Sequence, residues 1–226
     1  MAKICFDYGH GGSDPGAVYK GRKESEDNLA IGREIAKELR RHGITVDETR
    51  TADVAVSLRQ RSEFESKGNY DYFVSFHRNA FKPETVTRAE TFVYTKASTK
   101  SKELAEKIQN ALVGIGFINR GAKTANFHVL RETKAPAVLV EMGFIDNTKD
   151  NNLFDSKRKE IVIEITKAML AQLGISYKEE LATEKTDGQV LYRVMAGSYA
   201  VRKNAEKQVQ KLKTAGFDAT IMVFNR

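Results

Sequence analysis

Two histidines stand where the sequence predicts the ends of buried strands. His10 lies among glycines in DYGHGGSDPGA, residues 7–17, and His77 closes the apolar run YFVSFH. Glycine lets the backbone turn sharply after a strand and leaves room beside an imidazole ring. Because α/β sheets place their sites at strand ends, we expect both rings to meet at one edge if the two strands are parallel neighbours.

A carboxylate near the same edge would complete a metal site. Glu24, Glu26 and Asp27 all lie between the glycine turn and the first predicted helix, and the spacing alone leaves open which of them serves. Two imidazoles and one carboxylate suit zinc and leave a fourth position for water, as catalytic zinc sites require. The sequence therefore predicts a zinc site that combines His10, His77 and one of these acids.

Glu141 is a lone acid near the end of the apolar run AVLVEMGF. A charge in such a strand is costly, and burial should raise its pKa toward the range of a general base or acid. Each residue also has a simpler explanation. A strand-end histidine is often a hydrogen-bonded loop residue, Glu24 suits a helix N-terminus, and Glu141 would be stable beside an arginine.

The elements that must position these residues alternate along the chain. Helical spacing is clearest at Ile31, Ile35 and Leu39, which precede the stop signal Gly43. We predict strands at 3–8, 43–50, 70–77, 89–95 and 136–142, and helices at 27–42, 101–113 and 156–173. This alternation predicts an α/β fold in which helices cover a mixed sheet.

The chain after Gly174 has a different character. We expect a main domain at 1–175, a polar linker at 176–189, and a strand, helix, strand unit at 190–226. Ala205, Val209 and Leu212 keep helical spacing inside that last unit, which has too few elements to be stable alone.

Composition limits the classes of partner that the protein could bind. The formal charge of +7 favours a polyanion, but Lys and Arg alternate with Asp and Glu in helical segments, so we expect no nucleic acid. No apolar run is long enough for a signal peptide or for a membrane-spanning helix. We therefore expect the protein to be made in the cytoplasm without a signal peptide and not to insert into a membrane. The single cysteine, Cys5, is predicted to be a buried strand residue.

Six segments occur in the order of a known family: DYGHGGSDPGA, GRKES, LRQRSEF, FVSFHRNA, NRGAK and VLRETKAPAVLVEMGFIDN. Over residues 3–173 the chain resembles the zinc-dependent N-acetylmuramoyl-L-alanine amidases of the Amidase_3 type. The resemblance implies a three-layer α/β sandwich with a mixed central sheet. It also assigns roles: the zinc ligands are His10, Glu24 and His77, and the catalytic glutamate is Glu141.

The same resemblance implies a substrate. It is peptidoglycan, cut at the amide between the lactyl group of muramic acid and L-alanine. Asn79 and Arg120 are expected to contact it. At Arg78 the family usually has a small residue, and we expect this cation to hold an anionic muramyl or peptide carboxylate.

The tail VLYRVMAGSYAVRKNAEKQVQKLKTAGFDATIMVF resembles one half of a SPOR module. This implies cell-wall binding, and we expect a second chain to complete the sheet as a dimer. Without a signal peptide, the protein is expected to reach the wall after lysis, as a phage endolysin or an autolysin. Two other functions stay open: a non-catalytic peptidoglycan-binding protein and a zinc hydrolase of another amide.

Overall fold

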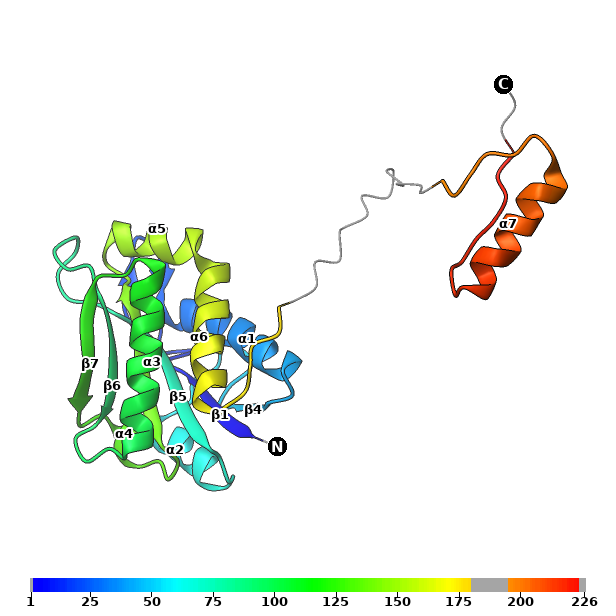
Figure 1. Ribbon diagram of the computed structural model, residues 1–226. Coiled ribbons are helices and arrows are strands. Elements are labelled where there is room, and N and C mark those ends of the chain that lie inside the picture. Colours follow the sequence, from blue (N-terminus) through cyan, green and yellow to red (C-terminus); the bar gives the residue numbers. More distant parts are fainter. Residues whose placement is uncertain (1, 180–194, 224–226) are drawn as a thin grey trace. The chain divides into compact units, whose positions relative to one another are not determined.

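The structure is a computed structural model that describes residues 2–179 and 195–223. The chain divides into two compact units, Met1–Glu179 and Glu180–Arg226, which are described separately. None of the helices in the described ranges has the length and apolar character of a membrane span. The elements of the first unit (Figure 1) are β1 (Lys3–Tyr8), β2 (Val18–Tyr19), β3 (Arg22–Lys23), α1 (Glu24–Arg41), β4 (Thr45–Glu48), α2 (Leu58–Ser66), β5 (Tyr72–Asn79), β6 (Ala89–Tyr94), α3 (Thr99–Ile115), β7 (Asn119–Ala125), α4 (His128–Arg131), β8 (Ala137–Phe144), α5 (Thr148–Ser156) and α6 (Arg158–Gln172).

Six strands form the central sheet, in the order β4-β1-β5-β8-β6-β7. The pair β6 and β8 is antiparallel, and the other neighbouring pairs of this sheet are parallel. The predicted mixed sheet is therefore confirmed. Strand β7 was not expected, because its sequence NRGAKTA has no alternating apolar residues.

Helices cover both faces of the sheet, as the three-layer prediction requires. Helices α1, α3 and α6 pack on one face over the larger apolar core, which includes Phe6 and Val140 (Figure 1). On the opposite face α4 packs on β8 and β6 and contacts α2, over a smaller cluster that contains Cys5, Phe73 and Leu139. Cys5 is buried, as predicted.

Helix α1 begins at Glu24, three residues before the range that its apolar pattern predicted. Glu24, Glu26 and Asp27 form its acidic first turn, where the helix dipole favours negative charge. The buried residues of α1 include Ile31, and the chain turns away at Gly43, which has a φ of 79°. The helix therefore presents the side chain of Glu24 at its end nearest the glycine loop.

The second unit contains helix α7 (Arg202–Thr214), where a helix was predicted. The described residues beside it, 195–201 and 215–223, are not assigned to strands. Residues 190–194 of the first expected strand lie outside the described residues. In the described part, the helix is therefore the element of the predicted strand, helix, strand unit that forms. A strand needs a hydrogen-bonded neighbour, and so small a unit offers few segments that could pair.

Candidate functional site

His10 and His77 meet at one edge of the sheet, as their strand ends predicted. Strands β1 and β5 are parallel neighbours, and the two imidazole centroids are 5.1 Å apart. His10 follows β1 in the glycine loop with a φ of 63°, an uncommon value for a residue other than glycine. Such strained backbone is held at functional sites when the surroundings over-determine it.

Glu24 lies between the two histidines. Its Oε1 is 2.9 Å from Nδ1 of His77, and its Oε2 is 3.2 Å from Nε2 of His10. The carboxylate is buried and also accepts the backbone N–H groups of Ala17 and Arg78. Of the other two acids of this turn, Glu26 instead pairs with Lys23 at the surface, and Asp27 pairs with Arg22 and Arg78. Of these three acids, the structure therefore brings Glu24 into the histidine cluster.

The charges within this cluster are strongly coupled. Burial opposes charge on all three groups, but the hydrogen bonds between them outweigh it. Glu24 and Asp14 raise the pKa of His10 to about 9, and Glu24 raises the pKa of His77. The two imidazoles in turn hold the pKa of Glu24 below its usual range.

The cluster fits a zinc ion. One ligand atom from each of His10, Glu24 and His77 can be chosen so that all lie within 4.8 Å of one another. A nitrogen, nitrogen, oxygen set of this kind leaves one tetrahedral position open. In addition, Nδ1 of His10 is 2.9 Å from Oδ2 of Asp14, which would orient the ring and leave Nε2 for the metal. Sequence reasoning had not singled out Asp14.

Glu141 stands directly beside the cluster. It occupies the partner position of His77 across the parallel strands β5 and β8. Its Oε2 is shielded from solvent and has no hydrogen-bond partner among the described residues. Burial, and then the negative charges of Glu24 and Glu90, raise its pKa to about 7 against the opposing charge of His77. The expected rise is confirmed, and a carboxyl group with this pKa can accept and return a proton near neutral pH.

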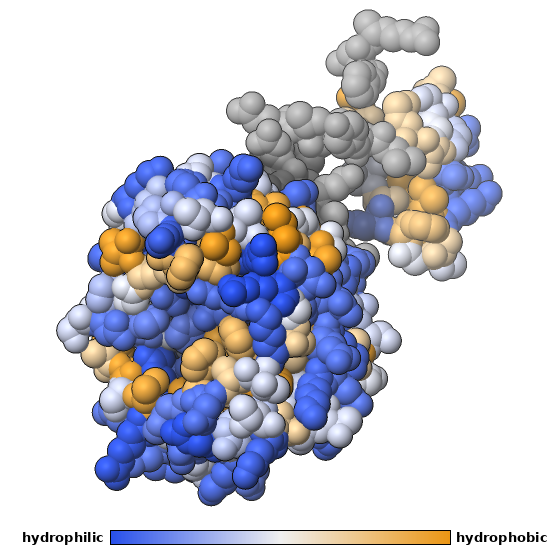
Figure 2. Space-filling model, turned by 90° about the vertical axis from the view of Figure 1, so that its left-hand side faces the viewer, coloured by the Kyte–Doolittle hydropathy of each residue, from blue (hydrophilic) through white to orange (hydrophobic). Residues whose placement is uncertain are grey.

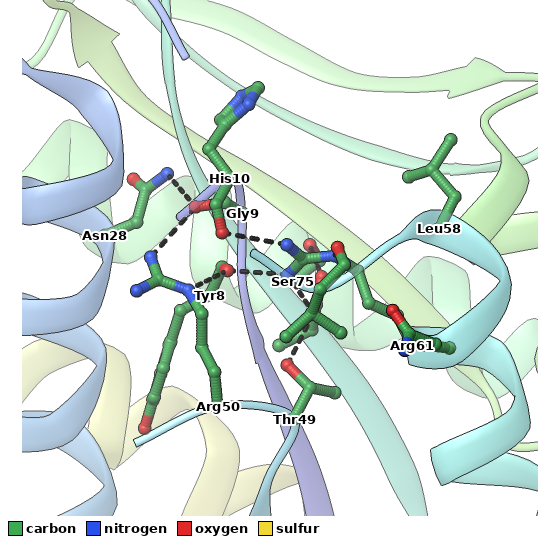
Figure 3. Close-up of polar contacts among 12 residues, drawn as sticks. Tyr8, Gly9, His10, Asn28, Thr49, Arg50, Leu58, Arg61 and Ser75 are labelled. Atoms are coloured by element: carbon green, nitrogen blue, oxygen red, sulfur yellow. Dashed lines mark hydrogen bonds and ion pairs between the residues drawn. The ribbon is translucent and has the colours of Figure 1, made fainter. Parts of the chain in front are cut away.

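Two buried arginines fix the backbone beneath His10 (Figure 3). Arg61 on α2 donates to the carbonyl of Tyr8 at 2.7 Å and to that of His10 at 2.8 Å. Arg50 donates to the carbonyls of Tyr8 at 2.8 Å and Gly9 at 3.1 Å. Because consecutive carbonyls are held by rigid guanidinium groups, the loop keeps His10 in its strained conformation.

Asp7 supplies the counter-charge for Arg61. Its Oδ1 is 2.7 Å from Nη1 of Arg61, and its two oxygens accept the hydroxyl groups of Thr49 and Ser75. Burial alone would raise the pKa of Asp7, but the charge of Arg61 and these donors hold it below the ordinary value. The ion pair is thus hydrogen-bonded on both sides, which a buried pair needs.

A cavity of about 540 Å³ opens next to the cluster. Its lining includes the polar side chains of His10, His77 and Glu141 and the apolar side chains of Leu58 and Phe127. Both of these apolar side chains are exposed. The cavity therefore combines a few polar and titratable groups with apolar side chains, as many ligand sites do.

Asn79 and Arg120, the expected substrate contacts, converge on one buried carboxylate. Nδ2 of Asn79 is 2.6 Å, and Nη1 of Arg120 is 3.0 Å, from Oε1 of Glu90. Glu90 occupies the partner position of Glu141 across β6 and β8. Both residues therefore lie close to the candidate base, although their contact with a substrate stays a prediction.

Arg78 requires a correction. It is 1% exposed, and its guanidinium pairs with Asp27, donates to Asn151 and stacks over Phe154 at 4.1 Å. Burial, opposed by Asp27, lowers its pKa to about 10. Neighbouring strand residues point to opposite faces, so Arg78 faces α1 and α5 while His77 faces the cluster. The expectation that Arg78 holds a substrate carboxylate is wrong for this structure.

Comparisons with known proteins identify the family of the chain. The Amidase_3 family, described as N-acetylmuramoyl-L-alanine amidase, matches residues 4–171, and the SPOR domain matches residues 161–222. The SPOR match begins within α6, which packs against α1 and α3 in the first unit. The sporulation-specific N-acetylmuramoyl-L-alanine amidase of Bacillus subtilis (strain 168) is 32% identical over 226 residues, covering 99% of this chain and 85% of that protein.

Solved structures show the same fold. An N-acetylmuramoyl-L-alanine amidase from Clostridium difficile 630 has a TM-score of 0.73 and 33% identity, covering 76% of this chain and 97% of that one. The catalytic domain of CwlV from Bacillus (Paenibacillus) polymyxa has a TM-score of 0.72 and 29% identity, covering 78% of this chain and all (100%) of that one. The chain belongs to the N-acetylmuramoyl-L-alanine amidase family of the Amidase_3 type and carries a SPOR domain match at its C-terminal end.

Proposed function

We propose that the chain is a zinc-dependent amidase of peptidoglycan. It hydrolyses the amide between the lactyl group of N-acetylmuramic acid and L-alanine of the stem peptide. Family membership supports the reaction class. The observation that carries the mechanism is that the ligand set His10, Glu24 and His77 lies directly beside Glu141, whose pKa is raised to about 7.

Zinc, when bound by the two histidines and Glu24, would polarise the scissile carbonyl and lower the pKa of water. Glu141 takes a proton from the attacking water as the new carbon–oxygen bond forms. It then returns that proton to the leaving nitrogen as the carbon–nitrogen bond breaks. The products are a lactyl carboxylate on the glycan and a stem peptide with a free L-alanine amine.

The C-terminal unit is proposed to hold the enzyme on its polymeric substrate, on the strength of the SPOR match. Action on the wall after lysis and dimerisation through this unit both stay predictions. A chain that ends at Ser176 lacks the C-terminal unit, so wall pull-down of this chain tests whether that unit binds the wall. Equal retention of the short and full chains would contradict it, and sedimentation of the full chain tests the dimer.

The reaction is tested with isolated cell walls, with and without a chelator. New L-alanine amino termini and new reducing sugar ends are measured in parallel. We expect L-alanine termini to increase, the chelator to stop this, and added zinc to restore it. Binding without any new termini on several wall types would favour a non-catalytic wall-binding protein. Metal-dependent cleavage of other amides alone would favour a different hydrolase.

A further inference from the structure

One row of side chains crosses four neighbouring strands of the sheet on the face that carries the site. His77 on β5 is the partner of Glu141 on β8, and Glu141 is the partner of Glu90 on β6. Partner positions place side chains on the same face. Lys123 on the edge strand β7 extends the row, because it is the partner of Phe92, two residues along from Glu90.

Glu90 organises the far end of this row. The residue is 2% exposed, and its Oε2 lies 2.7 Å from Nζ of Lys123 while its Oε1 lies 3.0 Å from Nη1 of Arg120. The side chains of Lys123 and Arg120 are themselves 36% and 39% exposed. A buried carboxylate thus fixes two cations at the surface of the sheet.

This end of the row has an excess of positive charge. In the part of the chain that the structure describes, Glu90 is the acid that pairs with both Arg120 and Lys123, so one positive charge remains uncompensated. Arg120 contacts Glu90 through Nη1, which leaves the other donors of its planar fork available for a carboxylate. Because Glu90 already holds both cations, an anion would bind here with little further loss of side-chain entropy.

The location suits a polar ligand that extends from the site. Strand β7 is at the edge of the sheet, on the left in Figure 1. Figure 2 turns that side toward the viewer and shows mainly hydrophilic residues, with apolar ones scattered among them. A chain that leaves the reacting amide along the row therefore meets charged groups.

We propose that Arg120 and Lys123 bind the α-carboxylate of the stem peptide's second residue, and that the protein prefers stems in which this group is free. The inference rests on the proposed function. The lactyl carboxyl is consumed in the scissile amide, so the nearest acid in the stem is the D-glutamate after L-alanine. Its α-carboxylate is free in some walls and a carboxamide in others, which makes Arg120 and Lys123 specificity-determining residues.

The test compares two soluble muropeptides that differ only in D-glutamate or D-isoglutamine at the second position. We expect the specificity ratio, kcat/KM for the acid over that for the amide, to be about 10 to 100, the range of one charged hydrogen bond. Arg120→Gln and Lys123→Gln should each lower this ratio several-fold, mainly through KM. Lys123→Arg should keep it. Lys100→Gln, an equal loss of charge on α3, is the matched control and should leave the ratio unchanged.

A ratio near one in the unaltered protein, or a ratio that neither glutamine variant changes, would overturn the inference. Failure to cleave either muropeptide would contradict the proposed function instead. In that case, a binding measurement that needs no cleavage tests the inference by itself. Calorimetry with the free stem tripeptides, which cannot be cleaved at this bond, should show tighter binding of the D-glutamate form, and equal affinities would overturn the carboxylate site.

Discussion

His77 and Glu141 occupy partner positions on the parallel strands β5 and β8, so a candidate metal ligand and the candidate proton acceptor stand side by side on one face of the sheet. Their proximity is set by strand register and not by a flexible loop. A slip of one residue would turn Glu141 to the opposite face. The apolar neighbours Val140 and Met142, buried on the other face, prevent that slip. Core packing therefore fixes the position of Glu141 relative to His77.

Replacement of Glu141 by glutamine should separate zinc binding from turnover. Glutamine keeps the shape of the side chain but cannot accept the proton, so we expect the release of L-alanine termini to fall by about 10²- to 10⁴-fold. Zinc content should remain near that of the unaltered protein. Substantial residual turnover in Glu141→Gln would remove Glu141 from its assigned role.

Glu24 and Glu26 lie in the same helical turn and form a natural matched pair. Glu24→Gln should weaken zinc binding strongly, because it removes the negative ligand that lies between His10 and His77. Glu26→Gln should leave zinc affinity unchanged, since Glu26 pairs with Lys23 at the surface. Chelator competition measures both affinities. A comparable loss in the two variants would contradict the ligand assignment.

Arg61 is predicted to act on the metal through the backbone. Arg61→Lys replaces a fork with a single ammonium, which cannot hold the carbonyls of Tyr8 and His10 together. We expect zinc affinity to fall by about 10- to 100-fold, as it does when groups that orient metal ligands are changed. Arg59→Lys on the same helix is the control, because Arg59 is exposed and pairs with Glu63. If the two variants bind zinc equally, Arg61 does not position His10.

The sequence was sufficient for those parts of the fold that have a regular pattern, such as the strands that carry His77 and Glu141. It did not reveal β7, whose residues are partly exposed throughout and show no apolar alternation. It misplaced Arg78, because a basic residue beside a site histidine gives no sign that it faces the opposite layer. Glu90 and Arg61 were missed for a related reason. Their roles depend on contacts between elements far apart in the chain, and local spacing carries no information about these.

The ion pair of Asp7 and Arg61 should make stability depend on pH in a defined direction. The pKa of Asp7 is lowered in the folded state, so its contribution is fully present above the unfolded value of about 3.9 and is lost as pH falls toward the folded value. Breaking such a buried pair costs about 3–5 kcal/mol. The difference in unfolding free energy between the unaltered protein and Asp7→Asn should therefore be largest near neutral pH and shrink below about pH 4. Urea unfolding across this range measures it, and a difference that grows on acidification would contradict the assignment.

Substitutions at two glycines can distinguish backbone strain from loss of the space that the metal site needs. Gly16 and Gly21 have φ values of 67° and 83°, so alanine is strained at both positions. At Gly16 a Cβ atom would lie 2.6 Å from Cδ2 of His10 and 2.7 Å from Oε2 of Glu24, whereas at Gly21 it would meet nothing within 4 Å. Both Gly16→Ala and Gly21→Ala should lower thermal stability, but only Gly16→Ala should also weaken zinc binding, because its methyl group displaces two ligands. Equal zinc affinity in the two variants would mean that the loop glycines serve the turn alone.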